Sequence, residues 1–125
     1  MDKTKILFVD DNIKFINNIR AYLKLVAPEY EVYTTGTGGD GLRILKEEKP
    51  SIFFCDLFLL DIDGDKVIEQ AQSISPNTIF IMLTAYTDEK TEERLKGMGI
   101  KHIIYKPLED METIVSLIHQ LSPKS

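Results

Sequence analysis

The chain has 125 residues, of which 43% are hydrophobic and 28% charged, and this balance is typical of a globular domain rather than of a disordered or fibrous protein. Its 20 acidic and 15 basic residues leave a formal charge of −5. Direct binding of nucleic acid is therefore not expected, because neutralising phosphates requires an excess of basic residues.

The cysteine content and the apolar runs restrict the compartment. The single Cys55 excludes an internal disulfide and a zinc site built from cysteines, and it fits a reducing environment. No apolar run approaches the ~20 residues that a helix needs to cross a bilayer. The N-terminal residues lead into only a short apolar segment, unlike a secretion signal. We expect a cytoplasmic protein outside the membrane, with residues 1–125 forming one domain.

Five short apolar runs predict β-strands. They lie at residues 6–9, 32–35, 52–55, 79–83 and 103–105. Four of them are apolar nearly throughout, which is typical of parallel strands that are buried on both faces of a sheet. The run at 32–35 contains two threonines and is predicted to be an edge strand.

The segments between these runs have the apolar spacing of helices. Two stripes are clear, the first formed by Ile16, Ile19, Leu23 and Val26 and the second by Met111, Ile114, Val115, Ile118 and Leu121. Three weaker helices are indicated by the apolar pairs Leu42 and Leu45, Val67 and Ile68, and Leu95 and Met98. Residues able to cap helix starts are also present, namely Asp11 and Asn12, Thr37, Thr87 and Asp88, and Asp110.

Alternation of strands and helices along the chain predicts an α/β fold. Right-handed crossovers make successive strands parallel, and the connecting helices cover both faces of the sheet. In open sheets of this kind, ligands bind outside the carboxyl ends of the strands. The residues that directly follow the strands are therefore the candidates for function.

Side chains with a carboxylate, hydroxyl or amino group follow four of the five predicted strands. Asp10 and Asp11 come after the first strand, Asp56 after the third, Thr84 after the fourth and Lys106 after the fifth. Because parallel strands end at the same edge of a sheet, we expect these side chains to lie close together.

This set of side chains suits the binding of a phosphoryl group. Carboxylates that meet at one edge repel each other, which raises the proton affinity of at least one of them unless a cation is present. Mg²⁺ is the natural cation, because it takes oxygen ligands from a few carboxylates, a phosphoryl group and water. Lys106 adds positive charge without filling the coordination shell, and Thr84 can donate a hydrogen bond to an oxyanion. The set predicts a carboxylate that carries a phosphoryl group.

The order Asp10-Asp11, Asp56, Thr84-Ala85, Lys106-Pro107 resembles the receiver domain of bacterial two-component response regulators. The resemblance extends from about residue 5 to residue 121. It implies a flavodoxin-like, doubly wound sheet of five parallel strands in the order 2-1-3-4-5, flanked by five helices. It also implies a protein that catalyses only its own phosphotransfer and dephosphorylation and is not an enzyme with an external substrate.

The resemblance implies a role for each acidic residue. Asp56 would accept a phosphoryl group from the phosphohistidine of a histidine kinase or of a phosphotransfer protein. Asp11 and Asp56 would coordinate Mg²⁺ together with the backbone carbonyl of Phe58. Asp10 would lie near the metal or act through water.

The remaining implications concern the phosphoryl group and the partners. Thr84 and Lys106 would bind the phosphoryl oxygens, and the bond between Lys106 and Pro107 would be cis. The protein would be a monomer or a phosphorylation-dependent dimer that acts on an output domain or a target protein, neither of which the sequence identifies.

Several positions depart from the usual pattern of receivers. Leu60 stands where proline is common, and Ile103 stands where an aromatic residue usually rotates on activation. Phe58 and Tyr86 place bulky side chains beside the predicted phosphorylation site. Tyr86 and Tyr105 are alternative candidates for transmitting a conformational change.

Two other functions fit parts of the sequence. A pseudo-receiver would keep the fold as an interaction module without phosphorylation, and Leu60 and Ile103 leave this alternative open. A phosphatase of the haloacid dehalogenase type also uses an aspartyl nucleophile, a hydroxyl, a lysine and Mg²⁺. Such enzymes carry a second acid two residues after the nucleophile, where this chain has Phe58.

Other motifs have simpler structural explanations. The segment 36–41 matches G-x-G-x-x-G, but it follows an edge strand and is predicted to be a flexible strand-to-helix loop. The acidic segment 61–65 fails as a calcium loop because Leu59 and Gln70 stand where ligands belong, and it includes a predicted turn before the third helix. Cys55 is predicted to be a buried strand residue.

Overall fold

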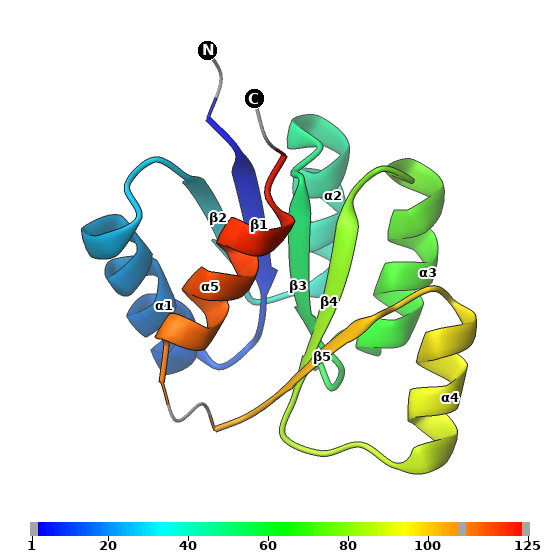
Figure 1. Cartoon of the computed structure of the whole chain (residues 1–125). Helices are drawn as coiled ribbons and strands as arrows, with labels where there is room; N and C mark the ends of the chain where they lie inside the picture. Colours follow the sequence, from blue (N-terminus) through cyan, green and yellow to red (C-terminus); the bar gives the residue numbers. More distant parts are fainter. Residues whose placement is uncertain (1–2, 108–109, 124–125) are drawn as a thin grey trace.

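The computed structural model describes residues 3–107 and 110–123, in which strands and helices alternate (Figure 1). The strands are β1 (Lys5–Val9), β2 (Glu31–Thr35), β3 (Ile52–Asp56), β4 (Ile79–Thr84) and β5 (His102–Tyr105). The helices are α1 (Ile13–Val26), α2 (Gly38–Glu48), α3 (Gly64–Ile74), α4 (Glu89–Gly97) and α5 (Glu112–Leu121). Each predicted strand and helix is present.

The strands form one parallel sheet in the order β2-β1-β3-β4-β5. This confirms the expected fold and the expected position of β2 at an edge. The register places Val9 beside Cys55, and it places the last residues of β3 and β4 beside Leu83 and Tyr105. The carboxyl ends of four adjacent strands therefore lie at one edge of the sheet.

Helices cover both faces of the sheet, as Figure 1 shows. On one face, α1 and α5 pack over Ile6, Phe8 and Phe54, and the rings of Phe8 and Phe54 stack with their centroids 4.5 Å apart. On the other face, α2, α3 and α4 pack over the alternate strand residues, such as Leu7 and Phe53. Each large side chain that is fully buried here contributes about 1.5–3 kcal/mol to stability.

The helix starts are fixed by local capping. Asn12, Thr37 and Asp88 each accept a hydrogen bond through the side chain from the backbone N–H three residues later. Asp110 accepts from the N–H of Glu112. α2 ends at Glu48, and the residue that caps its C-terminus, Lys49, has a left-handed φ of 46°.

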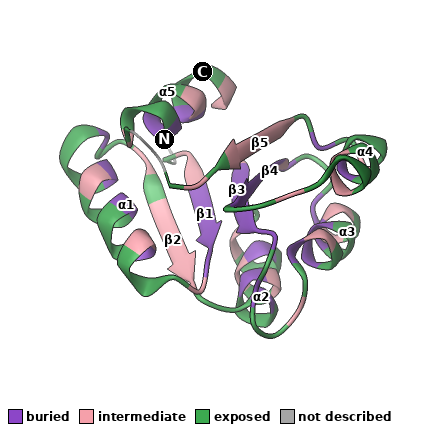
Figure 2. Ribbon diagram, turned by 90° about the horizontal axis from the view of Figure 1, so that it is seen from below, coloured by how far each residue is buried: buried purple, intermediate pink, exposed green. Residues whose placement is uncertain are grey.

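Burial differs from the expectation at one strand and one helix end. The apolar run at 103–105 predicted burial on both faces, but β5 lies at the second edge of the sheet, as the implied strand order requires, and is half-buried, with Tyr105 49% exposed (Figure 2). An edge strand has one neighbour, and the short apolar run did not reveal this. Val26 was expected on the buried stripe of α1 but is exposed, because the helix ends there and Ala27 turns into the core instead.

The segment 36–41 also differs from the expected flexible loop. α2 already begins at Gly38, and the carboxylate of Asp61 accepts hydrogen bonds from the N–H groups of Gly38 and Gly39 at 2.9 and 3.0 Å. These backbone contacts hold the pKa of Asp61 below its ordinary value. The loop after β3 is thereby joined to the start of α2.

Among the described helices, none has the length and apolar character needed to span a membrane.

Candidate functional site

The carboxyl edge of the sheet brings three acidic side chains together. Carboxylate oxygens of Asp10, Asp11 and Asp56 all lie within 4.8 Å of one another. Asp10 and Asp56 are buried, whereas Asp11 is half-buried. Both buried acids lie at or directly after the end of a central strand, where the chain leaves the sheet. The juxtaposition expected from the sequence is therefore present.

Lys106 joins the two buried carboxylates. Its Nζ donates to Asp10 Oδ2 at 2.6 Å and to Asp56 Oδ2 at 3.3 Å. The backbone N–H of Lys106 donates to the carbonyl of Thr84 at 2.8 Å, which fixes the lysine to the end of β4. The Lys106–Pro107 peptide bond is cis, as the resemblance implied.

Each buried carboxylate uses its other oxygen to fix the following loop. Asp10 Oδ1 accepts from the N–H of Asn12 at 2.9 Å, and Asp56 Oδ1 accepts from the N–H of Phe58 at 3.1 Å. Both contacts join a residue to the second one after it, so the two loops hold their acids in the same way. The carboxylates are thus positioned by backbone on one side and by Lys106 on the other.

The electrostatics of this arrangement disfavour the charge of Asp56. Burial and the neighbouring Asp10 raise the pKa of Asp56 to about 6, although the Phe58 N–H and Lys106 act in the opposite direction. Burial disfavours the charge of Lys106, but the hydrogen bond to Asp10 and the charges of both acids outweigh it and raise the lysine pKa. The site therefore holds a lysine cation beside an acid that is costly to ionise.

Removing this charge should stabilise the protein when Mg²⁺ is absent. The folded pKa of Asp56, about 6, lies above that of an ordinary aspartate. The folded state therefore binds the proton more tightly, and the stability cost of ionisation grows from about pH 4 to about pH 6. With allowance for solvent screening, Asp56→Asn should raise the free energy of unfolding by about 1–2 kcal/mol at neutral pH.

Urea unfolding in EDTA measures this difference at about pH 7.5 and about pH 4.5. The gain should be larger at the higher pH, because only there does the wild-type folded state carry the charge. An equal gain at both values, or a loss of stability at the higher pH, would contradict this account.

Thr84 lies at the site, but its hydroxyl is turned to the following loop. The hydroxyl donates to the carbonyl of Tyr86 at 2.6 Å and accepts from the N–H of Tyr86 at 3.2 Å. The side chain is fully buried. Its hydrogen bonds to described residues are therefore within the 84–86 loop and do not reach the acids.

The loops around the acids expose large apolar side chains. Phe58 and Leu60 after β3 are 55% and 92% exposed, and Tyr86 after β4 is 64% exposed. Phe58 and Tyr86 are the bulky positions that the sequence analysis placed beside the site. For Phe58, the described contact with the site is made by the backbone N–H.

Gly64 supports the site from the start of α3, a role that the sequence interpretation missed. Its N–H donates to the carbonyl of Leu57 at 2.7 Å. A β-carbon at this position would lie 2.0 Å from the carbonyl oxygen of Asp56. Only glycine therefore allows α3 to approach the end of β3 so closely. The Asp63-Gly64 pair indicated a turn, but nothing in the sequence indicated the close approach.

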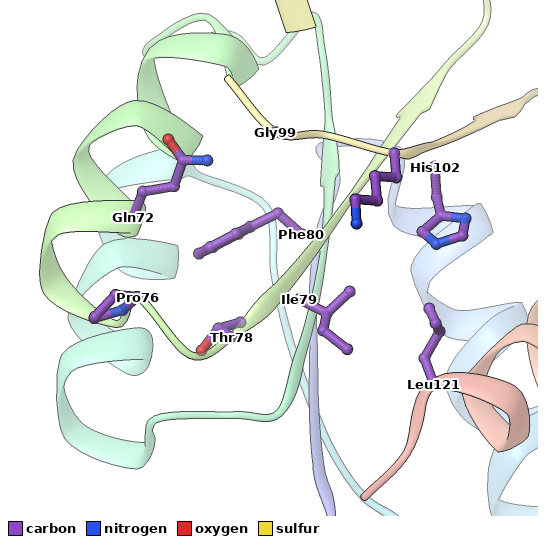
Figure 3. Close-up of a pocket in the computed structure, with 9 residues that line it drawn as sticks. Gln72, Pro76, Thr78, Ile79, Phe80, Gly99, His102 and Leu121 are labelled. Carbon is purple, nitrogen blue, oxygen red and sulfur yellow. The ribbon is translucent and has the colours of Figure 1, made fainter. Parts of the chain in front are cut away.

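Cavities lie at both the carboxyl and the amino edge of the sheet, but the acidic cluster lies only at the carboxyl edge within the described residues. A cavity of about 380 Å³ adjoins the cluster and is lined partly by Phe15, Lys106 and Met111. Another, of about 350 Å³, lies at the amino ends of β4 and β5, lined by residues such as Phe80 and His102 (Figure 3). The described lining of neither cavity contains an acidic residue, but the first shares Lys106 with the acidic cluster. The second cavity therefore has no carboxylate among its described lining to hold a metal ion.

Cys55 is a buried strand residue, as predicted. Burial, followed by the negative charge of Asp56, raises the pKa of its thiol far above the ordinary value. The reactive thiolate is the ionised form, so this environment disfavours a nucleophilic role.

The chain matches a family model described as the response regulator receiver domain over residues 6–119. It is 31% identical over 102 residues to the response regulator protein VraR of Staphylococcus saprophyticus, covering 82% of this chain and 49% of that protein. It is 28% identical over 104 residues to the transcriptional regulatory protein GlrR of Escherichia coli, covering 83% of this chain and 23% of that protein.

The fold is also found among solved structures. A response regulator receiver domain protein (CheY-like) from Methanospirillum hungatei superposes with a TM-score of 0.88 at 25% sequence identity, covering 95% of this chain and 93% of that one. By contrast, this chain spans about half the length of VraR and 23% of the length of GlrR.

Proposed function

This chain belongs to the response regulator receiver domain family, and from this premise we propose that Asp56 accepts a phosphoryl group from a phosphohistidine. The observation that carries the proposal is the convergence of Asp10, Asp11 and Asp56 with Lys106 at the carboxyl edge of the sheet. Formation of a Mg²⁺-dependent adduct on Asp56 from acetyl phosphate tests it. The donor in the cell would be a histidine kinase or a phosphotransfer protein.

The transfer requires one displacement at phosphorus. A carboxylate oxygen of Asp56 forms the new P–O bond while the P–N bond of the phosphohistidine breaks, and the imidazole leaves as a neutral ring that keeps the proton already on its other nitrogen. Lys106 lies where it can neutralise negative charge on the transferring group, because its Nζ is 3.3 Å from Asp56 Oδ2. Such positioning and neutralisation are the main contributions that a protein makes to phosphoryl transfer.

The acidic cluster fits a divalent cation. Asp11 is half-buried beside two other acids, and within the described residues no hydrogen-bond or ion-pair partner satisfies it. Asp11, Asp56 and the carbonyl of Phe58 would hold Mg²⁺, with Asp10 near the ion or acting through water. When bound, the ion would neutralise charge on the phosphoryl oxygens.

Loss of Asp11 should weaken Mg²⁺ binding by about tenfold or more, because the number of charged ligands largely sets the affinity of such sites. Asp11→Ala is the test, with isothermal titration calorimetry as the measurement. Binding by the wild type should also weaken as the pH falls through the carboxylate range, since protonation removes the ligand charge.

Asp63→Ala is the matched control, because the Asp63 side chain makes no capping hydrogen bond. Asp61→Ala is a second comparison, in which the start of α2 should lose stability while the metal affinity is kept. If the loop changes weaken Mg²⁺ binding more than Asp11→Ala does, the metal does not bind where we place it.

We expect phosphorylation to move the 84–86 loop. The Thr84 hydroxyl would leave the Tyr86 carbonyl and bind a phosphoryl oxygen, and the exposed ring of Tyr86 would move at little cost in burial. Ile103 should keep one rotamer, because β-branched side chains are stiff about χ1. Tyr105, which donates to Glu92 at 2.9 Å, links β5 to α4 and offers a route onward.

Comparison of the free and beryllofluoride-bound protein by NMR measures this movement. Large amide shifts should occur at Tyr86 and at the start of α4, while the methyl shifts of Ile103 stay those of one rotamer. A rotamer change at Ile103 with an unmoved 84–86 loop would refute this route. An unchanged face on beryllofluoride binding would indicate a phosphate carrier in a relay.

The family and the site support a signalling role for this protein. Phe58 stands where a haloacid-dehalogenase-type phosphatase has its second acid, so the chain is proposed to catalyse only its own phosphotransfer and dephosphorylation. This domain would control either an output domain joined to it, as the greater length of its relatives suggests, or a separate target protein. Family membership and the single, buried Cys55 support a cytoplasmic location.

A further inference from the structure

The ring of Phe15 lies over the ammonium group of Lys106. Nζ is 5.2 Å from the ring centroid, within the range of about 6 Å in which a cation is attracted to an aromatic face. Phe15 belongs to the first turn of α1 and is half-buried against the core cluster on that face of the sheet. The ring is therefore backed by packed side chains.

The ammonium group has few other partners. Of its three N–H donors, two are accounted for by Asp10 and Asp56, and the described residues supply no third acceptor. The lysine side chain is only 14% exposed. The described contacts of this cation are thus two carboxylates and one aromatic ring.

Local hydrogen bonds fix the backbone of Phe15 relative to Asp10, the acid that the lysine binds. The N–H of Asn12 donates to Asp10 Oδ1, and Asn12 Oδ1 accepts from the N–H of Phe15 at 3.1 Å. Lys106 then joins the Phe15 ring to Asp10 Oδ2. These contacts join Asp10, Asn12, Phe15 and Lys106 in one closed set, in which the ring is the part that faces the ammonium group.

The adjoining cavity explains why such a contact is needed. Its volume is about 380 Å³, which is room for several water molecules at ~30 Å³ each. Phe15 and Lys106 both line it, together with polar groups of Asn12 and Asn18. Water reaching the ammonium would offer acceptors that compete with Asp10 and Asp56. An aromatic face attracts the cation without competing for its N–H donors.

We propose that Phe15 is a positioning residue for phosphoryl transfer, holding the Lys106 ammonium group on Asp10 and Asp56 and limiting the access of water to it. The effect on phosphorylation rests on the proposed function of Asp56. The contact between ring and cation does not, and it is measurable without any phosphodonor.

Fluorinated phenylalanines at position 15 test this in the full chain. Increasing fluorination weakens the negative face of the ring with little change in shape, so the rate of phosphorylation by acetyl phosphate should fall in steps. The total fall should be about two- to fivefold, the size expected of one such contact. Phe15→Leu should fall as far as the most fluorinated ring, and Phe15→Tyr should keep the wild-type rate.

The same fluorinated series at Phe80 is the control, because this ring is buried and lines the cavity at the opposite edge (Figure 3). The rate should not change there. A graded effect at Phe80 equal to that at Phe15 would overturn the proposal, since it would reflect core packing rather than the cation. So would a flat response at position 15.

NMR of the Lys106 ammonium group, without Mg²⁺ or phosphodonor, tests the contact separately. Exchange of the ammonium protons with water should quicken along the fluorinated series and in Phe15→Leu. An unchanged exchange rate would overturn the contact, even in a protein that is phosphorylated normally. If the wild type acquires no phosphoryl group, the proposed function fails, and this exchange measurement still decides whether the ring holds the lysine.

Discussion

Incubation with acetyl phosphate and Mg²⁺ should place a phosphoryl group on Asp56, and Asp56→Asn should abolish the adduct. Asparagine keeps the volume of the side chain, and its oxygen can still accept from the Phe58 N–H. It lacks the carboxylate nucleophile, so no acyl phosphate can form. Mass spectrometry of the intact protein and its peptides measures the adduct, which should survive acid, break down in base and fail to form when EDTA is present during the incubation.

Asp63→Asn is the matched control for this experiment. It makes the same chemical change in the loop after β3, at a side chain that makes no capping hydrogen bond, and it should be phosphorylated like the wild type. Labelling of Asp56→Asn at the wild-type rate would refute the assignment of the nucleophile. A wild-type protein that stays unmodified would favour the pseudo-receiver alternative.

The sheet could be predicted from the sequence because its central strands are buried on both faces and are therefore apolar nearly throughout. All five residues of β3 are buried, so its apolar run had no polar alternation to obscure it. The order of the strands came only from the family resemblance, because alternation of strands and helices gives parallel pairing but not the order. β5 was misjudged because an apolar run of three residues does not show whether both faces of a strand are covered.

The cluster of Asp10, Asp56 and Lys106 could be predicted because each residue lies at or next to the end of a strand, and strand ends converge in a parallel sheet. The contacts that were missed depend on loops and rotamers. The Thr84 hydroxyl binds its own loop, and Asp61 binds the start of α2 from a distant loop. Neither contact leaves a periodic pattern in the sequence.

Gly64→Ala should be among the most damaging single substitutions in this protein. The added β-carbon would lie 2.0 Å from the Asp56 carbonyl oxygen and 2.8 Å from the α-carbon of Leu57. Both are backbone atoms, so no side-chain rotation relieves the clash, and α3 must move away from the end of β3. We expect a loss of about 3 kcal/mol or more in the free energy of unfolding, at the upper end for overpacking. Urea unfolding measures it.

Gly97→Ala separates this clash from the general effect of replacing glycine. Gly97 is the last residue of α4, and a β-carbon added there would meet no described atom within 4 Å beyond its chain neighbours and the backbone of its own helix. This substitution should stabilise the protein by about 0.4–1 kcal/mol, because alanine reduces the freedom of the unfolded chain. A loss below about 1 kcal/mol for Gly64→Ala would mean that α3 yields easily. Since the clash falls on Asp56, the residue that we propose accepts the phosphoryl group, Gly64→Ala should also slow phosphorylation of whatever protein remains folded, whereas Gly97→Ala should leave that rate unchanged.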